Sequence, residues 1–211
     1  GKQGLESILI TLIVSVFMGA IMTMQTKLNT ENPLLPAYTT GLVTRDCILL
    51  EFSSTILCLL LAGKVGSNIA SEIGTMRITE QIDAMEIMGV NSANYLIFPK
   101  IVAFMVMMPM LVTLSMFTGL FGGYAISEVA NVLTVEEYLL GIQYAFIPFY
   151  VWYSFIKTVV FAFIIASMAS YYGYYARGGA LEVGKASTKA VVNSSIVILL
   201  LDVVLTNLML N

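Results

Sequence analysis

The chain has 211 residues, of which 58% are hydrophobic and 11% are charged, and its net charge is −3. Soluble domains carry about a quarter charged residues, so this composition excludes an ordinary soluble protein and predicts an all-α protein that crosses a membrane several times. No basic patch is available for nucleic acid. The chain lacks histidine, and Cys47 and Cys58 lie too far apart on one predicted helix to bridge, so we expect no catalytic residue, metal site or cofactor on it.

Long apolar runs predict five membrane-spanning helices in a single domain that covers residues 1–211. The expected spans are approximately 5–25, 41–62, 99–126, 149–172 and 189–210. A hairpin within residues 138–176 would add a sixth span, but that run lacks polar residues for a turn. Five spans leave the two termini on opposite sides of the membrane.

A polar stretch at residues 63–90 separates the second span from the third. At 3.6 residues per turn, part of it (residues 75–90) forms an amphipathic helix whose apolar face carries Ile78, Ile82 and Met85. The charged residues fall opposite or at the borders of that face, namely Arg77, Glu80, Asp83 and Glu86. Such a helix is either a plain connection at the membrane surface or a coupling helix that fits a cleft on a nucleotide-binding subunit.

A second short helix is expected between the third and fourth spans. The run from Thr134 to Glu137 has the composition of a capping box, in which the threonine caps the helix and the glutamate reaches back. The helix would occupy residues 135–147, end before Pro148 and lie along the outer, periplasmic interface.

Lysine and arginine positions predict the orientation, because cytoplasmic loops carry an excess of them. With the N-terminus inside, seven fall in cytoplasmic segments and two outside; the inner set is Lys2, Lys64, Arg77, Lys100, Arg177, Lys185 and Lys189, and the outer set is Lys27 and Arg45. We therefore expect a cytoplasmic N-terminus, a cytoplasmic polar stretch and a periplasmic C-terminus.

Three charged residues fall inside predicted spans, where ionisable groups are costly and usually face a partner or a wet cavity. Lys157 and Asp202 lie at a similar depth, about 12 Å below the outer surface, so we expect them to pair. The pair is either a fixed salt bridge or part of a lipid path. Glu51 either contacts a lipid headgroup or is protonated and hydrogen-bonded to Ser53, Ser54 or a neighbouring helix.

The stretch Ala62–Lys100, AGKVGSNIASEIGTMRITEQIDAMEIMGVNSANYLIFPK, closely resembles the signature of the MlaE (YrbE-type) permease family. The segments IKTVVFAF, from Ile156, and VVNSSIVILLLDVVLTNLML are similar to that family too, so the resemblance covers nearly the whole chain. Two sites depart from the family pattern: residues 51–54 read EFSS in place of E-x-G-P, and Asn91-Ser92 replaces Asp-Pro.

The resemblance implies the membrane subunit of an ABC transporter that moves phospholipids between the inner and outer membranes of Gram-negative bacteria and so bears on lipid asymmetry. It implies a homodimer in the inner membrane, a pair of ATPase subunits that hold ATP and Mg, a ring of MCE-domain substrate-binding proteins, and a small accessory cytoplasmic subunit. The family usually has an amphipathic helix before its first span, which we expect to be largely absent here.

Under this interpretation the chain is not an enzyme, because it has no G-x-x-x-x-G-K-[ST] motif for ATP. The expected ATPase-coupling residues are Glu72, Arg77, Ile78, Glu80, Gln81, Asp83, Met85 and Glu86, and the expected lipid-pathway residues are Glu51, Lys157 and Asp202. The alternative is an ion- or proton-coupled carrier of another amphiphile, which would use the same three charges as an ion path.

Overall fold

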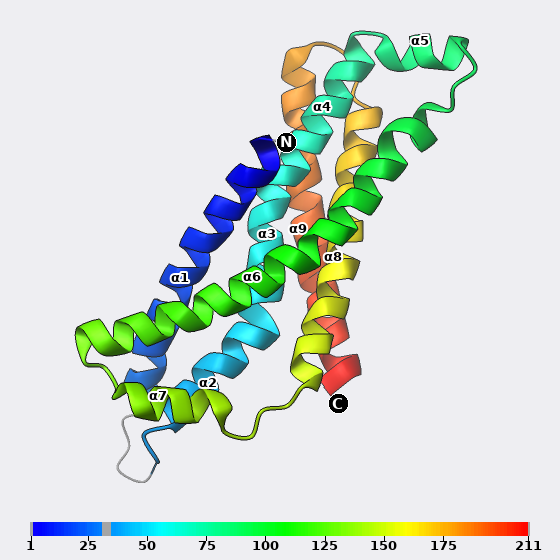
Figure 1. Ribbon diagram of the computed structural model, residues 1–211. Coiled ribbons are helices and arrows are strands. Elements are labelled where there is room, and N and C mark those ends of the chain that lie inside the picture. Colours follow the sequence, from blue (N-terminus) through cyan, green and yellow to red (C-terminus); the bar gives the residue numbers. More distant parts are fainter. Residues whose placement is uncertain (1, 31–34, 211) are drawn as a thin grey trace. The chain divides into compact units, whose positions relative to one another are not determined.

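A computed structural model describes residues 2–30 and 35–210, and over those residues it contains helices and no strands (Figure 1). Five helical stretches are long and apolar enough to cross a membrane, which confirms an all-α protein with five candidate spans. Helices suit this environment because each satisfies its own backbone hydrogen bonds where no water is available. The spans are Ser7–Thr30, Thr39–Ile78, Ala93–Ala130, Phe149–Tyr174 and Ala180–Leu210.

Individual elements follow one another with short connections, and three of them are π-helical. In chain order they are α1 (Lys2–Thr30), α2 (Thr39–Cys47), η1 (Ile48–Ile56), α3 (Leu57–Leu61), η2 (Ala62–Gly66), α4 (Ser67–Ile78), α5 (Gln81–Ile87), η3 (Ala93–Ile97), α6 (Phe98–Ala130), α7 (Val135–Gln143), α8 (Phe149–Tyr174) and α9 (Ala180–Leu210).

The second span is much longer than predicted. It runs unbroken through α2, η1, α3, η2 and α4 for 40 residues, whereas the sequence predicted its end at residue 62. At 1.5 Å per residue this helix is about 60 Å long, roughly twice the hydrocarbon thickness of a bilayer. The first half of the polar stretch therefore extends the helix, because Ile69, Ala70 and Ile73 still give it one buried apolar face.

The chain divides into two compact units, the first made of Gly1–Leu57 and Met110–Ile156. Inside it, α1 and α6 approach to backbone contact over glycines. A Cβ atom on Gly19 would lie 1.8 Å from the carbonyl oxygen of Gly119, and one on Gly122 would lie 2.1 Å from that of Val16. Small residues allow such close approach between membrane helices. These glycines therefore serve packing within the first unit.

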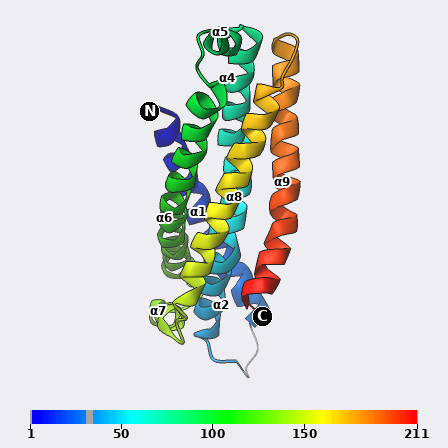
Figure 2. The ribbon, with the colours of Figure 1, turned by 90° about the vertical axis from the view of Figure 1, so that its right-hand side faces the viewer.

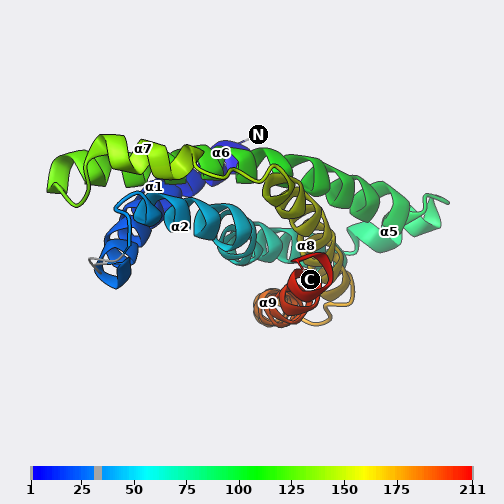
Figure 3. The ribbon, with the colours of Figure 1, turned by 90° about the horizontal axis from the view of Figure 1, so that it is seen from below.

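The first unit also holds α7 against α2 (Figures 1 and 3). The capping box is confirmed, since the backbone N–H of Glu137 donates to Thr134 Oγ1 at 3.3 Å and that of Thr134 donates to Glu137 Oε2 at 3.2 Å. The helix ends at Gln143 and not at residue 147. Its end is fixed by Arg45, which is 2% exposed and whose Nη1 donates to the carbonyl oxygens of Ile142 and Tyr144 at 2.8 and 2.7 Å.

The second unit comprises Cys58–Pro109 and Lys157–Asn211. Its α4 packs along α9, and Figure 2 shows α5 at the far end of α4. Gly173 of α8 comes close enough to α4 that a Cβ there would lie 2.7 Å from the carbonyl oxygen of Ala70. An apolar cluster fills the space among these helices, namely Ile69, Ala70, Ile73, Ile82, Leu96, Ala169 and Ala190.

Candidate functional site

The predicted coupling helix over residues 75–90 is wrong as a single element. Residues up to Ile78 belong to α4, and α5 begins at Gln81. Between them Glu80 has a φ of 60°, a left-handed conformation that is uncommon for any residue with a side chain. The hydroxyl of Thr79 donates back to the carbonyl oxygen of Thr75 at 2.8 Å and closes the last turn of α4. The chain therefore changes direction at Glu80.

This change of direction lets the apolar face of α5 pack onto the protein itself. Ile82 is fully buried in the cluster of the second unit, where it joins Ile73 and Leu96. Met85 packs against the same cluster and is partly buried. Ile78 is also partly covered. The predicted apolar face thus exists, but it is divided between two helices and seals the end of the unit.

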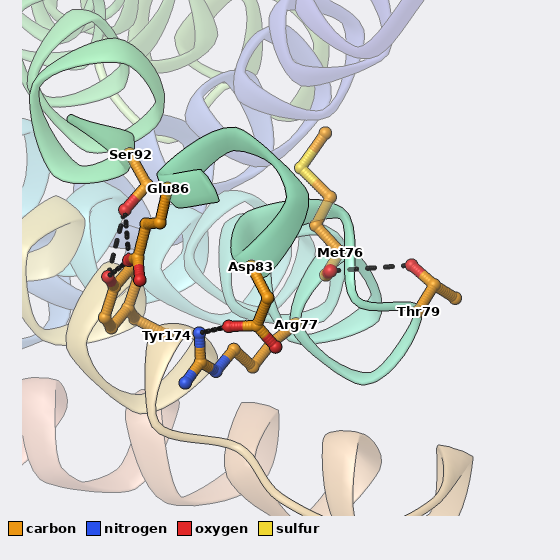
Figure 4. A network of polar contacts seen from close by, with 7 residues as sticks. All are labelled: Met76, Arg77, Thr79, Asp83, Glu86, Ser92 and Tyr174. Carbon is orange, nitrogen blue, oxygen red and sulfur yellow. Dashed lines mark hydrogen bonds and ion pairs between the residues drawn. The ribbon is translucent and has the colours of Figure 1, made fainter. Parts of the chain in front are cut away.

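One charge on α5 is neutralised by α4 (Figure 4). Arg77 Nη1 lies 2.6 Å from Asp83 Oδ1, in a charge-assisted hydrogen bond across the break. The guanidinium carbon of Arg77 lies 5.5 Å from the ring centroid of Tyr174, at the end of α8. The ion pair therefore holds the two helices together and also rests on a third.

The other charge on α5 is held by hydroxyl groups. Glu86 Oε1 accepts hydrogen bonds from Tyr174 Oη at 2.8 Å and from Ser92 Oγ at 3.0 Å (Figure 4). The Ser92 and Tyr174 oxygens lie 3.0 Å apart. The two hydroxyl donors, Tyr174 first, lower the pKa of Glu86 from its ordinary value because they stabilise the charged carboxylate.

The remaining predicted coupling residues behave differently from one another. Glu72 on α4 forms an ion pair with Lys100 of α6, with Oε2 and Nζ 2.5 Å apart. Glu80 and Gln81 are exposed at the break. Half of the eight predicted residues therefore take part in polar contacts inside the chain, namely Glu72, Arg77, Asp83 and Glu86.

The sequence analysis missed the most exposed apolar residues of this segment. Ile87 is 87% exposed, Met88 71% and Val90 40%, and we call these three residues the apolar tip. Gly89 has a φ of 79°, and the N–H of Val90 bonds to the carbonyl oxygen of Met85 at 3.0 Å. A glycine in this conformation ends a helix. The run Ile-Met-Gly-Val could have indicated this exposure. A glycine that ends a helix leaves the apolar residues on either side of it at the helix end, where they are not all buried.

Lys157 and Asp202 meet as predicted. Lys157 Nζ lies 2.5 Å from Asp202 Oδ1, and the two side chains are 0% and 15% exposed. Both belong to the second unit, where the pair joins α8 to α9. The mutual attraction in such a buried pair offsets part of the cost of placing the two charges in the membrane.

Glu51 belongs to the first unit and lies in η1. Its Oε2 accepts a hydrogen bond from Thr55 Oγ1 at 3.1 Å, one turn further along the same span. The predicted partners have other contacts: Ser54 donates to the carbonyl oxygen of Leu50 at 3.0 Å, and Ser53 accepts from Ser115 at 3.4 Å. Within residues 2–30 and 35–210, no group of three His, Cys, Asp or Glu side chains could hold a metal ion.

Comparison with known proteins gives a consistent result. The family model described as "Permease MlaE" matches residues 1–208. A probable ABC transporter permease protein of Rickettsia bellii is 36% identical over 210 residues, which is 97% of this chain and 79% of the relative. One from Synechocystis is 35% identical, with 98% and 78% covered. The chloroplastic protein TRIGALACTOSYLDIACYLGLYCEROL 1 of Arabidopsis thaliana is 28% identical, with 98% and 59% covered.

Proposed function

The chain belongs to the MlaE permease family and is an ABC transporter permease, and from this premise we propose that it moves phospholipids between the inner and outer membranes, energised by a separate ATPase subunit. The observation that carries the proposal is α5. This short helix lies outside the apolar spans, is fixed to the second unit on its apolar and polar sides, and presents an uncovered apolar tip. We propose a separate ATPase because the sequence contains no G-x-x-x-x-G-K-[ST] motif for ATP.

We propose that the apolar tip is the centre of the surface that the ATPase grips. Exposed apolar residues rimmed by polar ones mark protein–protein contact sites, and Glu80 and Gln81 form an exposed polar edge. In this proposal Arg77, Asp83 and Glu86 do not contact the ATPase but lie between the apolar tip and the rest of the second unit. They hold α5 in a fixed position, so that movement of the ATPase becomes movement of the spans.

The lipid path is proposed to use the charges within the spans. Acyl chains require apolar walls, whereas a headgroup requires the few polar groups at membrane depth, and Glu51, Lys157 and Asp202 are the candidates. The first unit also has a small, mainly apolar pocket beside η1, lined by Val14, Ser15, Met18, Gly19, Ile48, Phe52, Ser53, Ile56, Leu57, Ser115 and Gly119. The Arabidopsis relative is named for a glycerolipid, which supports a lipid substrate.

The proposed assembly rests on the resemblance to the family. We propose that two copies of the chain pair with two ATPase subunits in the bacterial inner membrane, with an MCE-domain ring on the periplasmic side and a small accessory subunit in the cytoplasm. The excess of lysine and arginine at the α5 end supports a cytoplasmic N-terminus and a periplasmic C-terminus.

The test is copurification after Ile87→Ser and Met88→Ser are combined. Both side chains are exposed, so the permease should keep its thermal unfolding temperature while it loses most of the bound ATPase and the ATP-dependent lipid movement in proteoliposomes. Leu181→Ser, at an equally exposed site on α9, is the control. Unchanged ATPase binding would refute the docking surface. Lipid or ion movement that follows a proton gradient without any ATPase would favour the carrier.

A further inference from the structure

Tyr174 occupies a particular place in the second unit. It is the last residue of α8, and its side chain lies next to the groups that involve both acidic residues of α5. Its ring lies under the guanidinium group of Arg77, which pairs with Asp83, and its hydroxyl group donates directly to Glu86. Figure 4 shows the tyrosine between these two groups. The end of α8 thus meets α5 at both of its charges.

The contacts of Tyr174 are directional, unlike the apolar packing beside them. The apolar cluster under Ile82 resists separation of α5 from the unit, but the hydrophobic effect itself is non-directional. The hydrogen bond to a charged carboxylate fixes distance and angle, and it is among the stronger kinds of hydrogen bond. The rotation of α5 about its own axis is therefore restrained by the hydrogen bonds from Tyr174 and Ser92, together with the Arg77–Asp83 pair.

The helix behind Tyr174 leads to the buried ion pair. The α-helix α8 is continuous from Phe149 to Tyr174, and Lys157 lies 17 positions before the tyrosine. At 1.5 Å per residue the two side chains are separated by about 26 Å along one rigid helix. Lys157 in turn binds Asp202 of α9. A chain of specific polar contacts therefore joins α5, α8 and α9 within one unit.

We propose that Tyr174 is the positioning residue that transmits movement of α5 to α8. This inference rests on the proposed function and makes it more specific, since it assigns the route by which movement of the ATPase reaches the Lys157–Asp202 ion pair. The ATPase moves α5, the hydroxyl and ring of Tyr174 carry that movement to the end of α8, and α8 shifts Lys157 with it.

A merely structural tyrosine would give a different result from a transmitting one. Loss of a structural hydrogen bond would lower stability and reduce ATP hydrolysis and lipid movement in parallel. Loss of a transmitting contact leaves the ATPase docked and turning over while less lipid moves for each ATP consumed. The ratio of lipid moved to ATP hydrolysed is therefore the informative quantity.

The experiment uses the complete transporter, the permease with its ATPase and other subunits, in proteoliposomes that contain a fluorescent phospholipid. Tyr174→Phe keeps the ring under Arg77 and removes only the hydroxyl group. We expect ATPase binding and hydrolysis within about twofold of the native complex, and about a fivefold fall in lipid moved per ATP. Glu86→Met, which removes the acceptor of the Tyr174 hydrogen bond, should give the same fall, and the double variant should be no worse than either single variant. Tyr175→Phe, at an exposed neighbouring tyrosine, is the control and should change nothing.

An unchanged ratio in Tyr174→Phe, or a parallel fall in hydrolysis and lipid movement, would overturn the role of Tyr174 and leave the proposed function standing. A native complex that binds no ATPase, or that moves no lipid with ATP, would overturn the proposed function itself. Thermal unfolding of each variant in detergent verifies that the comparison is made on folded protein.

Discussion

Two regions of the molecule are held together by different physical means. In the first unit, α1 and α6 meet backbone to backbone over Gly19 and Gly122, and no side chain fits between them. In the second unit, α5 is held by one buried isoleucine and by a set of charges and hydroxyl groups. The first kind of contact depends on close packing, whereas the second depends on hydrogen bonds that water can replace.

This difference indicates where the molecule can move. Contacts between helix backbones cannot be opened without loss of packing that the membrane does not restore. Hydrogen bonds and ion pairs at an aqueous surface exchange with water at a low net cost. We therefore expect the contact of α1 with α6 to act as fixed scaffold and the α5 end of the second unit to be the part that responds to a partner.

The largest effect is expected from Gly19→Ala. The added Cβ atom would fall 1.8 Å from a backbone oxygen, so the helices must separate, at a cost of about 3 kcal/mol or more. Thermal unfolding in detergent measures this cost. Gly184→Ala is the matched control, because a Cβ on Gly184 meets nothing within 4 Å. A Gly19→Ala protein that unfolds at the native temperature would show that α1 and α6 are not in close contact.

The next effect is expected from Lys157→Met, which leaves Asp202 without its buried partner. Breaking such a pair costs about 3 kcal/mol. The double variant Lys157→Met with Asp202→Leu removes both charges and should recover most of the lost stability, as judged by chemical unfolding. If that recovered double variant moves lipid normally, the pair is a fixed salt bridge; if it is stable but inactive, the pair belongs to the lipid path. A single variant as stable as the native protein would contradict the pair.

A smaller effect on the free energy of unfolding is expected when Ile82 and Ile87, two isoleucines of α5, are each replaced. Ile82→Ala empties a fully buried site and should cost about 2 kcal/mol in the free energy of unfolding. Ile87→Ala changes a residue that is 87% exposed and should alter that free energy by less than about 0.5 kcal/mol, while it weakens ATPase binding. Equal costs at the two positions would mean that α5 does not pack by its Ile82 face.

The smallest effect is a pH dependence of α5. Because the pKa of Glu86 is lowered from its ordinary value of 4.5, its contribution to holding α5 is complete above that value and is lost as the pH falls through the lowered pKa. Hydrogen exchange of the α5 amides, corrected for intrinsic rates, should show reduced protection in acid. Glu86→Gln is the control and should lack this pH dependence. The same acid response in both proteins would assign it to another group.

Much of this architecture could be predicted from the sequence because it depends on local patterns. Long apolar runs define the spans, the Thr134–Glu137 pattern defines the start of α7, and similar depth brings Lys157 and Asp202 together. The end of the second span was predicted too early, because a helix can leave the membrane and continue in water when one face remains covered.

The details of α5 could not be predicted, because they depend on contacts distant in sequence. No glycine or proline in the sequence indicates the break at Glu80. The break is favoured because it places Ile82 in the apolar cluster of the second unit. The polar residues Arg77, Asp83 and Glu86 looked available to a partner, but Tyr174, 88 positions after Glu86, takes part in holding them. The burial of Arg45 depends likewise on carbonyl oxygens of Ile142 and Tyr144.

The most direct test of the central claim is a photo-crosslinker placed at Met88, in the apolar tip, in intact cells. The account predicts that it captures an ATP-hydrolysing protein, and that the same crosslinker at Tyr144, which is 55% exposed beyond the end of α7, does not. Failure of the Met88 crosslinker to capture a nucleotide-hydrolysing protein would contradict the account. Labelling of position 88 by a membrane-impermeant reagent added on the periplasmic side would contradict it as well.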